Sequence, residues 1–514
     1  MKKYLLLLSL FISTIVFAQV PEDALRYSFY PQNGTARNLA IGGAMGSLGG
    51  DLNATFVNPA GLGFYKTNEF LFTPLLISNN NKARFRETDA KSKKTTLAFG
   101  TTGFIFGAIG GENTGNHNTL SLAITQTANF DNLIQYKGLN NYSSFSEQFA
   151  EEFAKSGYTI DEVLSSNSPL PYTSAPALYT YLIDTVKVNG VYQVKGAPEY
   201  ILDAGQALQQ EMTKKTNGGI EEVALAFAHN HNDKWYWGLT IGLPIIDYTS
   251  NTVFKEADTS ANTANHFKQF EYTDEFKTNG FGLNGRIGII YRPQEYIRLG
   301  LAVHTPTYMY LKDTRTTSLT TEVENPVEKY NVSSNTFTND QPGQSKYRQT
   351  SPFKAIISAS YVFREMENVK KQRAFISLDI EYVHHKGSKF SSDNENVTAG
   401  EKNYYKALNN VIKTDYKGSF NFRLGGELKF NIIMARLGFA YYGNPYKDAG
   451  YKANRMLLSG GLGYRNKGVF VDLTYVHAIS KDVSFPYRLE DRANTYATLK
   501  QQRGNIVATV GFKF

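Results

Sequence analysis

Cysteine is absent from this chain of 514 residues, which excludes disulfide-stabilised scaffolds, thiolate metal sites and thiol nucleophiles. Long hydrophobic runs are scarce too. Beyond residue 18 no stretch of roughly twenty apolar residues occurs, which argues against a helical membrane protein. Basic residues exceed acidic ones by eight, but they are scattered along the chain, so we expect no nucleic-acid partner. If the chain enters a membrane, it must do so with strands, in which only every second residue needs to be apolar.

The chain begins with the pattern of a secretory signal peptide. Lys2 and Lys3 form a basic start, an apolar stretch follows, and Val16-Phe17-Ala18 is typical of a cleavage site. We therefore predict a signal peptide at residues 1–18, with an uncleaved signal anchor as the alternative. No cysteine follows the site, so no lipoprotein anchor is expected.

Most of the remaining sequence consists of segments of about ten residues in which apolar and polar side chains alternate, as in transmembrane β-strands. In one of them Ile297, Leu299 and Leu301 share a face, opposite Arg298 and Gly300. The pattern predicts an all-β fold, a 14-stranded antiparallel transmembrane β-barrel over residues 67–514. The predicted strands lie near 68–77, 94–108, 117–129, 219–230, 234–247, 276–292, 296–311, 345–363, 373–386, 417–430, 432–444, 454–465, 468–480 and 503–514.

The connections between these segments alternate between short and long. Short turns belong on the periplasmic rim of such a barrel and long loops outside the cell. The longest connection, 130–218, is predicted to be a partly helical extracellular loop. A soluble all-β protein is the alternative, but it would not explain this alternation. Aromatic residues expected in two interfacial girdles support the membrane hypothesis, namely Trp235, Trp237, Tyr291, Tyr361, Tyr464 and Phe514 on one side and Tyr382, Tyr441 and Tyr475 on the other.

Residues 19–66 lack the strand pattern and are rich in small residues, ending in the turn sequence Asn58-Pro59-Ala60-Gly61. A barrel of this size has a lumen too wide for wall side chains to fill, so it carries either a channel or a plug. We predict that residues 19–66 form an N-terminal hatch inside the barrel. A disordered periplasmic tail is the alternative, although the segment is apolar for a tail.

This order of features resembles the FadL-type outer-membrane transporters of hydrophobic compounds. The resemblance implies a hatch containing Asn58, Pro59, Ala60 and Gly61, capture of ligand by outer loops, binding in the lumen and lateral release into the membrane. It implies long-chain fatty acids or aromatic hydrocarbons as ligands, with no cofactor. The long segments 130–218, 312–344 and 387–416 depart from the simplest members. The matching motifs are Thr35-Ala36-Arg37, Asn58-Pro59-Ala60-Gly61, Tyr291-Arg292-Pro293, Arg298-Leu299-Gly300, Leu378-Asp379-Ile380-Glu381-Tyr382, Arg423-Leu424-Gly425-Gly426-Glu427, Ala435-Arg436-Leu437-Gly438-Phe439 and Gly461-Leu462-Gly463-Tyr464-Arg465.

Two sets of residues are candidates for ligand binding. Phe145, Phe149 and Phe153 follow helical spacing, so their rings share one stripe that could form a greasy outer groove. The alternative is that this stripe packs the loop onto the barrel rim. A fatty-acid carboxylate needs a cationic partner, and Arg298, Arg423 and Arg436 are the candidate anchors. The alternative is that they belong to a ladder of ion pairs across the wall and to the hatch.

Chemistry beyond binding is not expected. The pairs His229 with His231 and His384 with His385 lack a third ligand, so no metal site is predicted. No serine stands out beside a histidine, so no enzyme is predicted. The leading hypothesis is passive transport of hydrophobic molecules by a monomer embedded in outer-membrane lipid. The rival is a bacterial outer-membrane docking protein that binds exported proteins with its long loops.

Overall fold

A computed structural model of the chain describes residues 21–110, 115–188, 190–263, 265–324, 327–363, 373–448, 450 and 453–514. The predicted signal peptide at 1–18 and the short connection 364–372, between the predicted strands 345–363 and 373–386, lie outside the described residues. No helix in the described part of the chain is long and apolar enough to cross a membrane.

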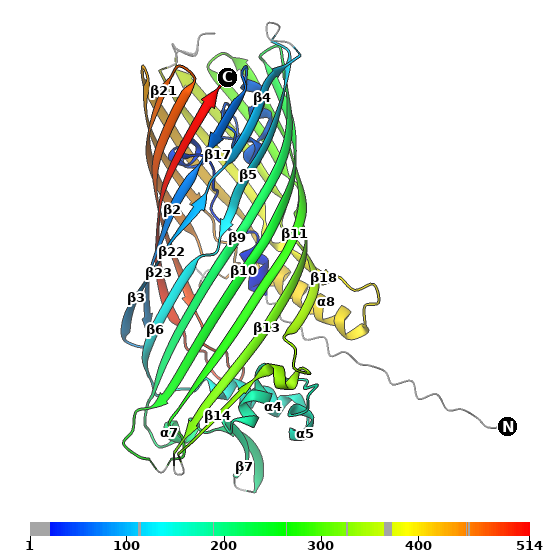
Figure 1. Cartoon of the computed structure of the whole chain (residues 1–514), viewed down its shortest axis with the longest axis vertical. Helices are drawn as coiled ribbons and strands as arrows, with labels where there is room; N and C mark the ends of the chain where they lie inside the picture. Colours follow the sequence, from blue (N-terminus) through cyan, green and yellow to red (C-terminus); the bar gives the residue numbers. More distant parts are fainter. Residues whose placement is uncertain are drawn as a thin grey trace, which may run out of the picture.

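The chain folds into a closed antiparallel β-barrel of fourteen wall strands, several of them interrupted by a bend, which confirms the predicted fold class (Figure 1). The last strand pairs with the first, for example at Phe70↔Phe512 and Leu75↔Val507, and this pairing closes the wall. In chain order the wall is built from β1 (Glu69–Phe72) with β2 (Pro74–Phe85), β3 (Thr88–Phe99) with β4 (Thr102–Ile109), β5 (His117–Asn129) with β6 (Asn132–Asn140), β9 (Leu208–His231), β10 (Trp235–Asp258), β11 (Gln269–Gln294), β12 (Ile297–His304) with β13 (Tyr308–Val323), β15 (Gly343–Thr350) with β16 (Lys354–Phe363), β17 (Ala374–His384) with β18 (Lys389–Ser392), β19 (Gly418–Phe430), β20 (Ile433–Tyr442), β21 (Arg455–Asn466), β22 (Val469–Ser484) and β23 (Ala497–Lys513).

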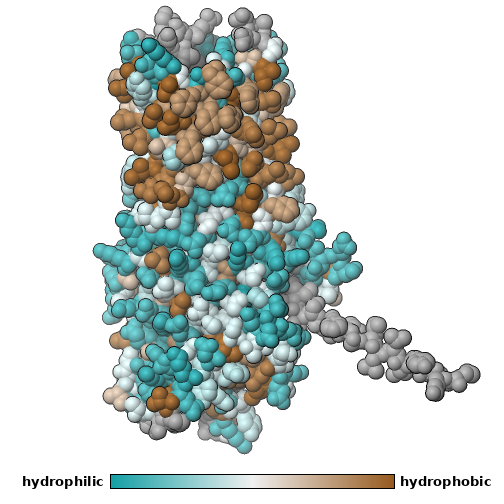
Figure 2. Space-filling model, viewed as in Figure 1, coloured by the Kyte–Doolittle hydropathy of each residue, from teal (hydrophilic) through white to brown (hydrophobic). Residues whose placement is uncertain are grey.

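Exposed apolar side chains of all fourteen wall strands form a band around the barrel. On the face drawn in Figure 2 this band lies near the end where Figure 1 places the C-terminus. Along β10 every second residue from Trp235 to Ile245 is apolar and exposed, whereas the residues between them are buried or face the lumen. Ten strand residues at about 3.3 Å each, tilted by about 40°, give a height of about 25 Å, which matches the apolar band of outer-membrane barrels.

The wall does not stop at the edge of this band. β10 continues to Asp258 and pairs with β9 and β11 throughout, so polar strand extends the barrel by roughly the same height again. Figure 2 shows this half as a predominantly hydrophilic surface. Much of what the sequence analysis assigned to loops is therefore wall. The first predicted long connection, 78–93, is a β-hairpin with a turn of only residues 86–87.

The same correction applies to the segment 130–218. Its ends form the wall strand β6 and the first part of β9, and only the middle leaves the wall. There it forms helices and a hairpin that cover the outer end of the barrel (Figure 1), and we call this part the cap. The cap consists of α4 (Ser146–Ser156), α5 (Ile160–Val163), α6 (Ser174–Tyr179), β7 (Ile183–Val188), β8 (Val191–Gly196) and α7 (Glu199–Asp203).

Two further outer segments contain secondary structure of their own. The segment 312–344 contains most of β13 and a strand paired with it, and 387–416 ends in a long helix that packs against β18. These elements are β14 (Glu328–Ser333), η2 (Ser334–Phe337), η4 (His385–Gly387) and α8 (Ala399–Asp415).

Residues 21–66 lie inside the barrel, and we call them the inner segment. They form short helices joined by turns, and most of their side chains are buried against the inner wall. Thr35 caps the second of these helices, because its side chain accepts a hydrogen bond from the backbone N–H of Asn38. The helices are α1 (Pro21–Arg26), α2 (Ala36–Ala40), α3 (Ala54–Val57) and η1 (Pro59–Phe64).

Candidate functional site: the barrel lumen

Asn58 links two parts of the inner segment to each other and to the barrel wall. Its Nδ2 donates to the carbonyl oxygens of Gly46 at 2.6 Å and of Ile289 in β11 at 3.3 Å. Its Oδ1 accepts from the backbone N–H of Ala60 at 3.1 Å and so caps η1, in which Pro59 is the first residue. Asn58, Pro59, Ala60 and Gly61 are all buried. These hydrogen bonds fix the path of the inner segment at Asn58. The role of the motif as part of a hatch is a proposal.

Glycines in the wall make room for this close packing. A Cβ atom at Gly288 would lie 1.8 Å from Asn58 Oδ1, and one at Gly438 would lie 2.1 Å from the backbone nitrogen of Gly42. The contact at Gly438 is with backbone and cannot be relieved without moving the inner segment, whereas the contact at Gly288 would displace the buried Asn58 side chain that holds this segment. The wall is therefore shaped to hold the segment. Other wall glycines whose added Cβ would clash with it are Gly238, Gly300 and Gly425.

Polar wall residues bind the backbone of the inner segment. Asp379 in β17 accepts from the backbone N–H groups of Met45 at 3.1 Å and of Gly46 at 3.0 Å. Arg298 in β12 donates to the carbonyl oxygen of Leu48 at 2.5 Å, and its guanidinium lies 4.5 Å from the ring centre of Phe64. Arg298 therefore lies where it holds the inner segment.

Arg436 in β20 is held by two carboxylates. Its Nε lies 2.6 Å from Glu427 Oε2 and its Nη1 2.5 Å from Asp472 Oδ1, and its side chain is 0% exposed. Glu427 also lies 3.7 Å from Nε of Arg37 in α2, so the network joins three wall strands, β19, β20 and β22, to the inner segment. This geometry favours the ion-pair alternative for Arg436 over the ligand-anchor hypothesis.

Arg436→Ala is expected to lower the free energy of unfolding by about 3–5 kcal/mol, because it leaves buried carboxylates without their partner. Urea unfolding in detergent micelles, followed by tryptophan fluorescence, measures the change. Arg348→Ala is the matched control, because its pair with Asp393 is exposed and should contribute less than about 1 kcal/mol. Equal stability of the two variants would contradict the structural role of Arg436.

Arg423 in β19 differs from the other two arginines because it lines a described cavity. Its Nη2 lies 2.8 Å from Glu381 Oε1, but its Nε and Nη1 are buried with no hydrogen-bond partner. It lines a cavity of about 110 Å³ together with Lys354, Tyr30 and His304. Of the three candidate arginines, Arg423 is the one that faces a described cavity with free donors.

A larger chamber of about 1530 Å³ lies between the inner segment and the outer half of the wall. One side is apolar and includes Leu25 and Phe29 of the inner segment and Leu75 and Ile77 of β2. Other parts of its lining are charged, with more cationic side chains than carboxylates. This combination suits an amphipathic molecule with an apolar chain and an anionic head.

The cations of the chamber include two arginines that the sequence analysis did not single out, Arg455 in β21 and Arg503 in β23. The guanidinium of Arg455 lies 4.7 Å from the ring centre of Phe29, and Nε of Arg503 donates to Asn505 at 3.2 Å. Within the described part of the chain, neither guanidinium has a carboxylate at ion-pair distance. The sequence does not reveal that these two side chains point inward, because they lie beyond the part of the wall in which outward residues are regularly apolar.

The three candidate phenylalanines lie in the cap and not in either chamber. Phe145, Phe149 and Phe153 are buried, and Phe149 is only 1% exposed. The ring of Phe145 stacks on Phe254 of β10 with 4.3 Å between the ring centres. Neither of the two described cavities is lined by any of the three. Their burial favours the alternative that they pack the cap onto the barrel.

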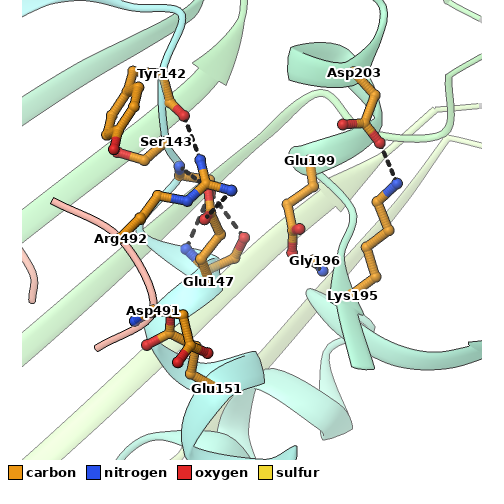
Figure 3. Close-up of polar contacts among 12 residues, drawn as sticks. Tyr142, Ser143, Glu147, Glu151, Lys195, Gly196, Glu199, Asp203, Asp491 and Arg492 are labelled. Atoms are coloured by element: carbon orange, nitrogen blue, oxygen red, sulfur yellow. Dashed lines mark hydrogen bonds and ion pairs between the residues drawn. The ribbon is translucent and has the colours of Figure 1, made fainter. Parts of the chain in front are cut away.

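A polar latch ties the cap to the loop 485–496, which joins β22 to β23 (Figure 3). Arg492 donates to the carbonyl oxygen of Tyr142 at 2.6 Å and lies 3.1 Å from Glu147 Oε2. Glu151 in α4 accepts from the backbone N–H groups of Glu490 and Asp491 at 2.7 and 3.3 Å. Cap and loop therefore close the outer end as one unit.

Glu256 lies beneath the cap, in the part of β10 outside the apolar band. It accepts hydrogen bonds from the Ser144 hydroxyl, from Gln210 Nε2 at 2.6 Å and from the Phe145 backbone N–H at 3.2 Å. Burial nevertheless raises its pKa to about 7, because the charged form loses its hydration. The carboxyl group therefore titrates near neutral pH.

The cap is expected to loosen as the pH rises. The folded-state pKa of Glu256 exceeds its usual value of 4.5, so its contribution to stability is full below pH 4.5 and is lost as the pH rises through about 7. Hydrogen exchange of α4 amides, corrected for intrinsic rates, should show less protection at pH 8 than at pH 5. Glu256→Gln should keep the protection at both pH values, whereas Glu271→Gln, an exposed control, should behave like the parent chain. Equal protection of the parent chain at pH 5 and pH 8 would contradict this role.

The wall has a seam between its second and third strands. β4 pairs with β5 from Thr102↔Ile124 to Ile109↔Asn118. Further out, among the described strand pairs, β3 has a ladder only with β2, and β6 only with β9. Side chains hold the seam there, including the ion pair of Lys94 Nζ with Asp131 Oδ1 at 2.6 Å.

The inner segment reaches this seam at its inner end. Nδ2 of Asn33 donates to the carbonyl oxygens of Phe99 in β3 at 3.1 Å and of Gln126 in β5 at 2.8 Å. A Cβ atom at Gly100 would lie 2.1 Å from the carbonyl oxygen of Gly34, so the two backbones touch. Asn33 and Gly34 thus lie between two wall strands at the point where their ladder ends.

No group of three or more potential ligands that could hold a metal occurs among the described residues. His304 is engaged with the inner segment, since one of its ring nitrogens lies 2.8 Å from the carbonyl oxygen of Val57. The predicted pairs His229 with His231 and His384 with His385 lie at opposite ends of the apolar band, on β9 and at the end of β17.

The solved structures that share this fold include two proteins of Pseudomonas. The P. putida toluene transporter TodX is 13% identical, with a TM-score of 0.52 over 94% of this chain and 99% of that one. A Pseudomonas aeruginosa FadL homologue gives the same identity, TM-score and coverage. No family model matches the chain. No curated protein matches it either. The resemblance seen in the sequence therefore extends to the fold of these two barrels.

Proposed function

We propose that this protein is an outer-membrane barrel that transports hydrophobic molecules passively, with long-chain fatty acids as the first candidate and aromatic hydrocarbons as the second. The observation that supports this most is the chamber of about 1530 Å³, which is lined by the wall strands and the inner segment and has both apolar and cationic residues in its lining. The fold of the toluene transporter TodX and of the FadL homologue agrees with such a role. The membrane band and the short turns at the opposite end from the cap agree with an outer-membrane location.

In this proposal the inner segment is the hatch, and the ligand leaves sideways. The chamber borders the seam, because Asn129 and Asn132 line it. Asn33 bridges the seam where the ladder ends, so a small displacement of the hatch would open a path between β3 and β5 toward the lipid. Such a route needs no energy source, because a hydrophobic molecule gains free energy on entering the membrane.

The chamber arginines give the proposal its test. Arg455→Gln with Arg503→Gln is expected to weaken binding of a fluorescent fatty acid to the purified protein at least tenfold, because the carboxylate loses its cationic partners. Binding of toluene should change less than twofold. Arg84→Gln with Arg348→Gln is the matched control, since both residues lie outside the chamber.

Three results would contradict the fatty-acid assignment or the transport role. If the chamber variant and the control bind the fatty acid with equal affinity, the chamber arginines do not bind its carboxylate. Binding of toluene but not of fatty acid by the parent chain would favour the hydrocarbon. A parent chain that binds neither would overturn transport.

The rival docking function is favoured by one observation. The cap and its flanks expose tyrosines to solvent, with Tyr158 at 46%, Tyr181 at 59% and Tyr192 at 70%, and tyrosine is common in protein interfaces. A chain that binds exported proteins but no hydrophobic small molecule would support docking over transport.

A further inference from the structure

Four lysines stand side by side on the outer surface of the barrel. Lys91 in β3 lies directly opposite Lys82 in β2, Lys82 opposite Lys500 in β23, and Lys500 opposite Lys481 in β22. All four are exposed. We call them the lysine row.

Strand parity shows that the row points away from the lumen. On each of the four strands, the residue six positions closer to the periplasmic end faces the same way as the lysine. These four residues are exposed apolar residues of the membrane band. Lys481 and Lys500 are also among the residues that line the chamber, but their Cβ positions follow the outward parity of β22 and β23. The residues of the band at this position are Leu97, Leu76, Ile506 and Tyr475.

The height of the row fits a lipid head-group layer. Six residues along a strand tilted by about 40° correspond to about 15 Å above the edge of the band. A fifth lysine, Lys93, lies two residues closer to the membrane on the same face of β3. Flexible lysine stems let the ammonium groups reach down toward the membrane surface.

Directly opposed like charges destabilise a sheet, so a row of four needs an explanation. Asp89 lies 3.2 Å from Lys82 Nζ, and within the described residues it makes the one ion pair of the row. Elsewhere on the outer wall Lys255 stands opposite Glu271 at 2.6 Å, and Lys312 stands opposite Lys346 as a single like-charged pair rather than as part of a row of four. The row is thus a local excess of positive charge without matching protein carboxylates.

Protection of a free strand edge does not account for the row. Lysines often guard unpaired edges, and β3 has such an edge at the seam. However, Lys82, Lys500 and Lys481 lie on strands that are paired with neighbours at these positions. Their charges guard no edge.

We propose that the lysine row binds the phosphate groups of a phosphorylated glycolipid in the outer leaflet. The proposal rests on the proposed placement of the barrel in an outer membrane. We assign the phosphate to a lipid rather than to a free ion, because the row lies on the same outer surface of β2, β3, β22 and β23 that faces lipid in the apolar band. Ammonium groups spaced at strand separation, about 4.8 Å, can share phosphate oxygens, and the anion relieves their mutual repulsion.

The test uses the full chain in phosphatidylcholine nanodiscs and lipid A carrying two phosphates as the probe. Native mass spectrometry counts the bound lipid. The variant K82Q/K91Q/K481Q/K500Q is expected to bind lipid A at least tenfold more weakly than the parent chain. The matched control K255Q/K277Q/K312Q/K346Q removes four other exposed outward lysines and the same charge, and it should bind like the parent chain. Fully dephosphorylated lipid A should not bind above the background of phosphatidylcholine.

Each other result overturns the proposal. Equal loss in both variants would show a bulk charge effect, and no loss in either would show that the row is not a site. Displacement of lipid A by an equal concentration of inorganic phosphate would show a site for the free ion. A separate readout tests the placement itself, because a folded outer-membrane barrel inserts into lipid vesicles and migrates differently on gels before and after heating. If insertion fails, the proposed location fails; if insertion succeeds and lipid A does not bind, the lysine row alone is refuted.

Discussion

Oxidation of a Ser47→Cys, Ser358→Cys double variant is expected to reduce fatty-acid uptake at least tenfold, and a reductant should restore it. The two hydroxyl oxygens lie 2.8 Å apart, one in the inner segment and one in β16, so cysteines at these positions can form a disulfide with little movement. The bond would tie the proposed hatch to the wall. Because the chain has no cysteine of its own, no competing disulfide can form. Uptake of a fluorescent fatty acid by cells or proteoliposomes measures the effect.

The control for this prediction places a disulfide within the wall. Ser78→Cys with Thr95→Cys joins β2 to β3 at directly opposite positions and does not touch the inner segment. Its oxidation should leave uptake unchanged. If the locked hatch variant transports as fast as its reduced form, the inner segment does not need to move and the hatch proposal is refuted.

Gly288→Ala with Gly438→Ala should turn the protein into an open pore. The added methyl groups would lie 1.8 Å from Asn58 Oδ1 and 2.1 Å from the backbone nitrogen of Gly42, so the inner segment cannot keep its place. With the segment displaced, a fourteen-strand barrel has a lumen wide enough for water and ions. Conductance in planar lipid bilayers is expected to rise at least tenfold.

Gly460→Ala is the matched control for this pore prediction. Gly460 faces outward, and its added Cβ would have no neighbour closer than 3.4 Å. This variant should keep the low conductance of the parent chain, and heat-dependent gel migration should show that all variants fold. A folded double variant with unchanged conductance would show that the inner segment does not block the lumen.

The barrel itself could be predicted because lipid imposes a strict pattern. Along β10 each outward residue from Trp235 to Ile245 meets hydrocarbon and each inward residue meets the lumen, so the period of two is visible in the sequence. The fourteen strands were found from this signal. Their outer halves were not, because water lies outside the wall there and polar side chains satisfy both faces.

The site was harder to predict for the same reason. Arg455 and Arg503 occupy inward positions beyond the apolar band, where nothing in the sequence marks the two faces. Arg436 was proposed as an anchor because it faces inward, but its carboxylate partners come from β19 and β22 and depend on the register of the strands. The role of Phe145 and Phe149 could not be predicted either, because an apolar stripe on a helix does not indicate whether it contacts a ligand or packs against the barrel wall.

The extended wall also places the mouth of the barrel far from the lipid. Polar strand adds roughly 28 Å beyond the apolar band, and the cap adds to this height. Bacteria often carry a dense layer of sugar chains on the cell surface, and an opening level with the membrane would be buried under it. If the barrel lies in an outer membrane as proposed, the tall wall raises the opening out of that layer, and the proposed ligand would reach the opening from water without crossing the sugar chains.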